Sequence, residues 1–369
     1  FRIFSGSVRS DGKYFNSVRN VEERFNSMMV MRGKDQIPMT VLHVGDMGVV
    51  AKLNDTKTGD TFSGRTENLR VTKPDFPDPL FAVAVSPKTQ ADIAKMGTIL
   101  TNLAQSDPTL RWRQDADVKQ TIVEGMGEAH VNLAISRAAK LGVGMDIGIP
   151  KVPYKETITR QGSDFYRHKK QSGGAGQFGE VHLRLEPNPG GGFPYETQIV
   201  GGVISASFIP SIEKGIHSVL GEGVIAGFPI VDVKAVVFDG KEHPVDSKDI
   251  AFQIAGREAF KKVFEDSGPV LMEPIMEVQI TVPEAVMGDV MGDLNTRRGR
   301  VQGMDTEGHK GVITAQVPYS EMMRYGNVLR SITAARGVYT MKFSHYEQVP
   351  AQIAQPIINA HKASHATPA

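Results

Sequence analysis

A strand followed directly by a helix can be read from residues 275–299, IMEVQITVPEAVMGDVMGDLNTRRG. From Met276 to Val282, apolar side chains alternate with polar ones, as expected for a strand with one face on a hydrophobic core. Pro283 suits the first turn of a helix, and Gly299 is expected to end that helix. The apolar face of the helix is a stripe with four-residue spacing: Val286, Val290 and Leu294.

This strand and helix open a pattern that is predicted twice in the chain. Two more strands and a second helix, whose apolar face carries Tyr325 and Leu329, follow within residues 274–350. The same order is predicted for residues 80–150, with strands at 80–85, 109–113, 119–124 and 143–147 and helices at 89–104 and 127–141. Both segments are therefore predicted to be ferredoxin-like βαββαβ modules.

The remaining segments differ in character. Residues 1–73 contain short alternating strands separated by turn signals, which favours a small β-barrel. Three prolines within residues 73–79 predict an extended connector. Residues 151–273 mix strands with two helices and predict an α+β domain, whereas residues 351–369 are expected to hold one short helix and a disordered tail. The predicted fold class is a multidomain α+β protein.

Composition excludes several classes of protein. The chain has 369 residues, of which 40% are hydrophobic and 22% charged, as in soluble proteins with more than one core. No apolar run approaches the roughly 18 residues that span a bilayer, so we expect no membrane contact and a cytoplasmic location. The absence of cysteine excludes disulfides and thiolate metal sites. Because Phe1 lies in what reads as a strand, we expect that an upstream segment has been removed.

The sequence has no phosphate-binding loop of the G-x-x-x-x-G-K-[ST] type. Gly-Lys pairs occur at residues 12–13, 33–34 and 240–241. Each is followed by a residue without the Ser or Thr hydroxyl that holds magnesium in such loops: Tyr14, Asp35 and Glu242. We therefore predict no catalytic residue, no metal site and no cofactor in this chain.

The strongest chemical signal lies in residues 167–181, RHKKQSGGAGQFGEV. Its glycines allow a backbone to approach a partner closely, and the flanking cations attract phosphate. A flexible hairpin with a solvated run of charge is an equally good interpretation of the residue types alone.

A second polar loop is predicted at residues 239–249, just before a helix. Asp246, Ser247 or Asp249 could cap that helix, which is the more ordinary interpretation. His243 and Asp246 could also form an acid–base pair. Because no nucleophile or metal cluster accompanies them, catalysis is not predicted here.

Two further segments have both a structural and a functional interpretation. In residues 125–130, GMGEAH, the glycines suit a turn from strand to helix, and Glu128 complements the positive end of the helix dipole. Glu128 and His130 are two residues apart and do not share a helix face, which argues against a metal site. Three cations near another helix end could offset its dipole or contact RNA phosphate: Arg297, Arg298 and Arg300.

Short motifs from Phe1 to about residue 350 follow the order found in bacterial elongation factor G, and the chain resembles that family of translational GTPases. The motifs are Ser5-Gly6, Gly59-Asp60-Thr61, Gly125-Met126-Gly127-Glu128, Gln171-Ser172-Gly173-Gly174, Gly201-Gly202-Val203-Ile204, His243-Pro244-Val245-Asp246-Ser247, Glu273-Pro274-Ile275-Met276, Met287-Gly288-Asp289-Val290 and Leu294-Asn295-Thr296-Arg297-Arg298-Gly299.

The resemblance implies a division into domains. Residues 1–73 would be the translation-factor barrel (domain II), short of its first strand, and residues 80–150 would be domain III. Residues 151–273 would be domain IV, an α+β domain resembling a small-subunit ribosomal protein. Residues 274–350 would be domain V, followed by a C-terminal helix and tail at 351–369. The GTPase domain would precede this chain, so GTP and magnesium are expected only for the full-length protein.

The resemblance also implies a function in translocation. Domain IV would enter the decoding site behind the moving transfer RNA, domain III would couple nucleotide state to domain IV, and domain V would approach the factor-binding centre of the large subunit. The implied partners are both ribosomal subunits, transfer RNA and messenger RNA, and the protein would be a monomer. This interpretation requires the loops at 171–177 and 239–249 to lie side by side at an exposed end of domain IV.

The residues implied by the resemblance fall into three groups. Those for RNA contact in domain IV are Lys169, Lys170, Gln171, Ser172, Gly173, Gly174, Gln177, His243, Asp246 and Ser247. Those for coupling in domain III are Met126, Gly127, Glu128 and His130. Those for a possible ribosomal RNA contact in domain V are Arg297, Arg298 and Arg300.

Three residues depart from the family pattern: Ala129, Ala175 and Lys248. They fit a divergent paralogue, whose task could be translocation, ribosome recycling or ribosomal protection. Two alternatives come from other classes: a small-molecule enzyme that uses Glu128 or His243, and a bare interaction module.

Overall fold

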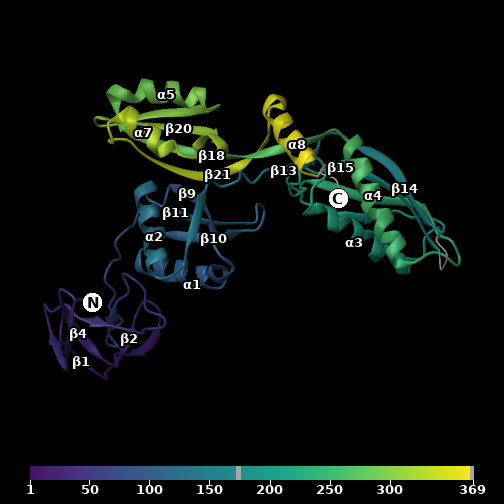
Figure 1. The fold of residues 1–369 in the computed structure, drawn as a ribbon. Helices are drawn as coiled ribbons and strands as arrows, with labels where there is room; N and C mark the ends of the chain where they lie inside the picture. The colour runs from purple at the N-terminus through teal and green to yellow at the C-terminus, as the bar shows by residue number, and fades with distance from the viewer. Residues whose placement is uncertain (172–175, 366–369) are drawn as a thin grey trace. The chain divides into compact units, whose positions relative to one another are not determined.

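The computed structural model describes residues 1–171 and 176–365 (Figure 1). The chain forms two compact units, one of residues 1–79, 87–112 and 123–146 and the other of the remaining residues. Helices and sheets alternate along the chain, which confirms the multidomain α+β class. No helix in the described part of the chain is long and apolar enough to span a membrane.

Three small sheets share one core in the first 63 residues. Their orders are β1-β6, β3-β2-β8 and β5-β4-β7, and the shared core holds Ile3, Phe25, Met28 and Leu42. The strands are short, as the closely spaced turn signals predict. Their bounds are β1 Ser7–Arg9, β2 Lys13–Asn16, β3 Val21–Arg24, β4 Met28–Arg32, β5 Asp35–Met39, β6 Val41–His43, β7 Val49–Val50 and β8 Phe62–Ser63.

The carboxylate of Asp60 ties this segment together. It accepts hydrogen bonds from the Asn16 amide (3.2 Å), the Arg19 guanidinium (3.0 Å), the Lys57 backbone N–H (3.0 Å) and the Lys73 ammonium (2.7 Å). Burial alone would raise the pKa of Asp60, but these donors outweigh burial and hold the pKa well below its usual range.

The predicted βαββαβ order is present in the second segment. Its helix α1 begins with a capping box, in which the Thr89 hydroxyl and the Asp92 carboxylate each accept the backbone N–H of the other residue. The four strands form one sheet in the order β10-β11-β9-β12. The bounds are β9 Phe81–Pro87, α1 Gln90–Ser106, β10 Arg111–Asp115, β11 Gln120–Gly125, α2 Glu128–Lys140 and β12 Met145–Gly148.

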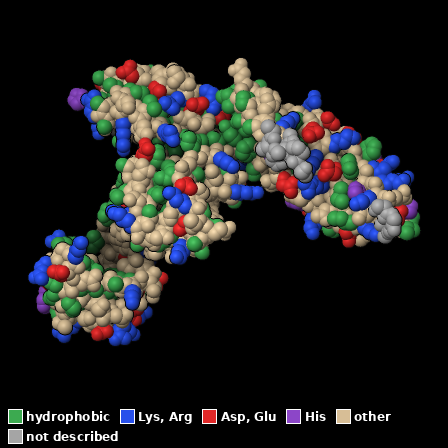
Figure 2. Space-filling model, viewed as in Figure 1, with side chains coloured by type: hydrophobic (Ala, Val, Ile, Leu, Met, Phe, Trp, Pro, Cys, Tyr) green, Lys and Arg blue, Asp and Glu red, His purple; other side chains and the backbone are tan. Residues whose placement is uncertain are grey.

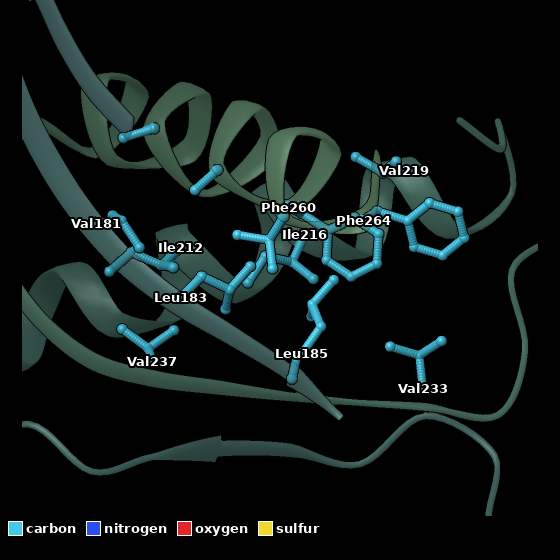
Figure 3. Packing of buried hydrophobic residues seen from close by; sticks show 14 of the residues in the cluster. Val181, Leu183, Leu185, Ile212, Ile216, Val219, Val233, Val237, Phe260 and Phe264 are labelled. Carbon is cyan, nitrogen blue, oxygen red and sulfur yellow. The ribbon is translucent and has the colours of Figure 1, made fainter. Parts of the chain in front are cut away.

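The third segment has a four-stranded sheet in the order β14-β15-β17-β16, with helices α3 and α4 packed on one face. The core between sheet and helices includes Leu183 and Leu185 from β15 and Ile212, Ile216 and Phe260 from the helices (Figure 3). The bounds are β13 Lys155–Ile158, β14 Gly162–Lys170, β15 Gln177–Pro187, β16 Tyr195–Thr197, α3 Ile209–Leu220, β17 Val233–Lys241 and α4 Asp249–Asp266.

Helices α3 and α4 approach each other so closely that glycine is needed at the contact. A Cβ on Gly215 would lie 2.1 Å from the carbonyl oxygen of Gln253, and a Cβ on Gly256 would lie 2.8 Å from the carbonyl oxygen of Ile212. Neither gap can hold a methyl group, because real Cβ contacts do not fall below about 3 Å.

Glu156 on β13 holds the loop between α3 and β17. Its side chain is fully buried, and its two carboxylate oxygens accept four backbone N–H groups at 2.7–3.1 Å. The donors are Val224, Ile225, Ala226 and Phe228. This loop packs in turn on Leu271, Val349 and Ala354, so the carboxylate organises a second small core.

The C-terminal segment has the predicted second βαββαβ order. It differs from the prediction in two ways. Strand β18 begins at residue 269 instead of 275 and pairs with β13 through its first four residues, so it crosses the expected domain boundary after residue 273. Helix α8 continues to His365, beyond the short helix that was expected. The bounds are β18 Pro269–Pro283, α5 Met287–Thr296, β19 Arg300–Glu307, β20 Lys310–Pro318, α6 Tyr319–Met322, α7 Tyr325–Thr333, β21 Val338–Gln348 and α8 Ala351–His365.

The end of α5 also differs from the prediction. The helix stops at Thr296, and the left-handed residue that follows is Arg298, with φ at 57°, instead of Gly299. Gly299 is still required, because a Cβ there would lie 2.7 Å from the carbonyl oxygen of Leu294. Arg298 tolerates this backbone conformation while its guanidinium is held by Glu273 and Glu321.

Candidate nucleic-acid interface

The two loops singled out in the sequence lie side by side at one end of the third segment. Phe178 and Ser247 form a parallel bridge, the Phe178 N–H donates to the Asp246 carbonyl oxygen at 2.9 Å, and the Ser247 hydroxyl donates to the Phe178 carbonyl oxygen at 3.0 Å. Gly176 has to be glycine at this crossing, since a Cβ would lie 2.6 Å from the Asp246 carboxylate. We call residues 169–171, 176–178 and 242–247 the tip.

The first loop contributes exposed cations to the tip. Lys169 and Lys170 end strand β14 and are exposed, as is Gln171. Gln177 faces back onto β14, where its side-chain oxygen lies 3.0 Å from His168 Nε2. Figure 2 shows lysine, arginine and histidine side chains gathered at this end of the segment, at the right of the view. The predicted RNA-binding residues Ser172, Gly173 and Gly174 lie outside the described residues.

The second loop orients one imidazole toward solvent. His243 Nδ1 lies 3.3 Å and 3.1 Å from the backbone N–H groups of Val245 and Asp246, so it acts as a hydrogen-bond acceptor. The ring proton then belongs on Nε2, which makes that nitrogen a donor. The His243 side chain is 49% exposed, and the Asp246 carboxylate lies 3.5 Å from Nδ1. The tip can therefore offer an N–H donor next to its cations.

Ser247 holds the tip together and does not cap the helix that follows. Its hydroxyl accepts the His243 N–H at 2.8 Å and donates to the carbonyl oxygen of Phe178, so it joins the two loops. Helix α4 starts at Asp249 after Lys248, and among the described residues no side chain caps its first turn. The helix-cap interpretation of Asp246, Ser247 and Asp249 is therefore wrong.

A third loop, which was not predicted as part of the site, is fixed to the second one. Both the N–H and the hydroxyl of Ser205 donate to the Glu242 carboxylate, at 2.8 and 2.9 Å. Two successive left-handed glycines, Gly201 and Gly202, turn the chain just before Ser205, and Val200 is 83% exposed. The glycine pair is the signal in the sequence that could have identified this loop.

In the second segment, His130 joins a turn to the end of helix α1. His130 Nδ1 accepts the Met126 N–H at 3.1 Å, and Nε2 lies 2.9 Å from the Asp107 carboxylate. Burial would raise the pKa of Asp107, but hydrogen bonds from Thr109 and His130 lower it below its usual value. Gly127 precedes the helix and Glu128 is its first residue. The described residues contain no group of three or more His, Asp or Glu side chains that could hold a metal.

The three C-terminal arginines all contact carboxylates of their own segment. Arg297 pairs with Asp293 at 2.8 Å, Arg298 pairs with Glu273 at 2.5 Å, and Arg300 pairs with Glu347. The Arg298 side chain is 26% exposed, while that of Arg300 is 67% exposed. The geometry thus gives Arg298 a structural role and leaves Arg300 as the most accessible of the three.

Three family models match the chain. The model described as elongation factor G, domain III, matches residues 76–148, and the model for domain IV matches residues 150–268. The model for the elongation factor G C-terminus matches residues 270–357. The chain is also similar to the crystal structure of a protein from Thermus thermophilus, with 36% identity and a TM-score of 0.81. That match covers 98% of this chain and 55% of the other, so the chain spans about half of that relative.

Proposed function

Because this chain belongs to the elongation factor G family of translation factors, we propose that it binds the ribosome and promotes GTP-dependent translocation of transfer RNA and messenger RNA. The observation that carries the proposal is the tip, where two loops 69 residues apart in sequence are joined through Phe178 and Ser247. Such a narrow, hydrogen-bonded end can enter a space between RNA strands without unfolding.

The tip offers the chemistry that an RNA backbone requires. Lys169 and Lys170 supply positive charge for phosphate, and His243 Nε2 supplies a donor. No large aromatic side chain is needed at the end of such a tip, because the contact is with a backbone and not with stacked bases. In the proposed mechanism the tip acts as a steric stop behind the transfer RNA, and the chain breaks no covalent bond.

The proposal places nucleotide hydrolysis in another part of a longer protein. GTP and magnesium would bind a GTPase domain, and the turn at residues 126–130 would pass its conformational change toward the tip. The bonds from His130 to Met126 and Asp107 suit that task, since they make the turn move together with helix α1. Arg300 would contact ribosomal RNA through its exposed guanidinium.

Ribosome recycling or ribosomal protection is the alternative within the same superfamily. Such factors would also bind the ribosome, but their activity would not depend on residues 171–177 holding back a transfer RNA. In a protein that joins this chain to a family GTPase domain, substitution of residues 171–177 should abolish translocation. The alternative would be supported if the unsubstituted protein showed no translocation and if the substituted protein recycled ribosomes at the normal rate.

Ribosome binding by the tip can be tested with two histidines of equal exposure. His243 and His217 are each 49% exposed, but His217 lies on helix α3, where it pairs with Glu213. We expect His243→Ala to weaken co-sedimentation with ribosomes about tenfold, as for loss of a hydrogen bond to a charged group. His217→Ala is the control and should bind normally. Equal affinities for both variants, or binding that salt leaves unchanged between roughly 50 and 200 mM, would refute RNA contact by the tip.

A further inference from the structure

The open face of the β14–β15 hairpin has an unusual composition for a solvent-facing sheet. On β15, Val181, Leu183 and Leu185 point into the core beneath α3 and α4. Because side chains alternate along a strand, the residues between them face the side of the sheet opposite to α3 and α4. We call the eight outward residues of these two strands the hairpin face. As cross-strand pairs they are Ser163–Arg184, Phe165–His182, Arg167–Glu180 and Lys169–Phe178.

Aromatic rings form a connected row across this face. The rings of Phe165 and His182 stack with centroids 5.0 Å apart and planes inclined by 18°. His182 meets Phe238 of β17 edge-on at 5.9 Å, and the guanidinium of Arg184 lies 6.0 Å from the Phe238 ring. Phe165 is 41% exposed, although its ring is also positioned by the Lys262 ammonium at 5.5 Å. The row is thus held in place, and Phe165 is its most exposed ring.

The hairpin face carries three cations, Arg167, Lys169 and Arg184, of which Arg184 pairs with Glu186 at 2.7 Å. Its one acid, Glu180, is largely buried and accepts from both Arg167 and His182. Burial would raise the pKa of Glu180, but hydrogen bonds from these two donors lower it, so the carboxylate is ionised beside the Arg167 guanidinium. Lys169 is exposed, and the neighbouring exposed acid is Asp239 on β17.

We propose that the hairpin face binds single-stranded RNA, with bases stacked on the Phe165–His182–Phe238 row and phosphates on Arg167 and Lys169. Proteins hold unpaired RNA in this way because every base has an aromatic face and every nucleotide a charge. The row combines both features, since Arg184 and Lys262 lie against its outer rings, Phe238 and Phe165. The face also continues into the tip, since the ring of Phe178 lies 6.1 Å from that of His243.

The stacking row lies outside the tip, whereas Lys169 and Phe178 belong to both, so the hairpin face extends the proposed function to further side chains. An RNA strand that reaches the tip would run along the hairpin from Lys169 toward Ser163. The stacking row would then determine how the strand leaves the tip, and the strand would have to be unpaired to use it.

The test uses the whole chain and a fluorescein-labelled oligouridine of about 12 nucleotides, a length suited to one such sheet. Fluorescence anisotropy should show binding that Phe165→Leu weakens about tenfold, because leucine keeps an apolar side chain but cannot stack a base. Phe165→Trp should restore the affinity. The matched control is Phe343→Leu on β21, since Phe343 is also an exposed phenylalanine on a strand, at 57%.

Three results would overturn the proposal: no binding of the oligonucleotide, equal affinity of wild type and Phe165→Leu, or an equal loss in Phe343→Leu. Thermal melting of each variant identifies any that fails to fold. If Phe165→Leu does not fold, the affinity of Phe165→Trp is compared with that of the wild type instead. Failure of this proposal can be told apart from failure of the proposed function, because the proposed function is tested separately by the ribosome binding of His243→Ala. Oligonucleotide binding that survives in His243→Ala but is weakened in Phe165→Leu would support the stacking row as its site.

Discussion

Replacing Glu156 with glutamine should release the loop that joins α3 to β17. The buried carboxylate accepts the N–H groups of Val224 and Ile225 on one oxygen and those of Ala226 and Phe228 on the other. Glutamine keeps one oxygen, but its NH₂ group would face two N–H donors. Each buried N–H left without an acceptor costs about 1–3 kcal/mol, so we expect a loss of about 4 kcal/mol.

Amide hydrogen exchange measures this loss at the loop itself. At about 1.4 kcal/mol for each factor of ten, exchange of residues 224–228 should become roughly a thousandfold faster in Glu156→Gln. Glu213→Gln is the control, because Glu213 is 45% exposed on helix α3 and its pair with His217 contributes little. A change below about tenfold in a folded Glu156→Gln protein would refute the view that this carboxylate holds the loop.

Other perturbations follow from the same structure. Gly215→Ala should lower the midpoint of urea denaturation by separating α3 from α4, because the new methyl group would meet the Gln253 carbonyl; an unchanged midpoint would contradict the close packing. Ser247→Ala removes the one side-chain bond seen between the described parts of the tip loops and the bond that Ser247 accepts from His243, and we expect ribosome binding several-fold weaker with little change in global stability. The pKa of Asp60 is lowered on folding, so its stabilising effect is present at neutral pH and declines as the pH falls below about 5. Urea denaturation of Asp60→Asn should accordingly show a weaker dependence on acid than the wild type does.

Local patterns in the sequence were sufficient for most elements of the fold. The alternation before Pro283 and the stripe through Val290 predicted β18 and α5, because burial imposes a period on each element. The extra length of β18 was not predictable in this way. Its first residues are stabilised by pairing with β13, more than a hundred residues earlier, and such a partner leaves no local pattern.

The position of the candidate site was predictable from the sequence, but the roles of its individual residues were not. Glycines and cations indicated where the two loops lie, since those residue types have local causes. The functions of single polar residues were not predictable, because each depends on a distant partner. Ser247 was expected to cap a helix or touch RNA, yet its hydroxyl is occupied by His243 and Phe178. Glu242 likewise binds Ser205, 37 residues away.

These bonds divide the tip into groups that shape it and groups that can contact a partner. Ser247 and Glu242 have their hydrogen-bonding capacity satisfied within the protein, so a phosphate would have to break existing bonds to reach them. Among the described residues, no such bond holds Lys169, Lys170 or His243 Nε2. Within the tip, affinity for RNA should therefore depend mostly on these three groups, whereas Ser247 should act through the precision of the fit. Substitutions in the two sets would then be separable, because loss of a cation reduces the salt dependence of binding and loss of the hydroxyl does not.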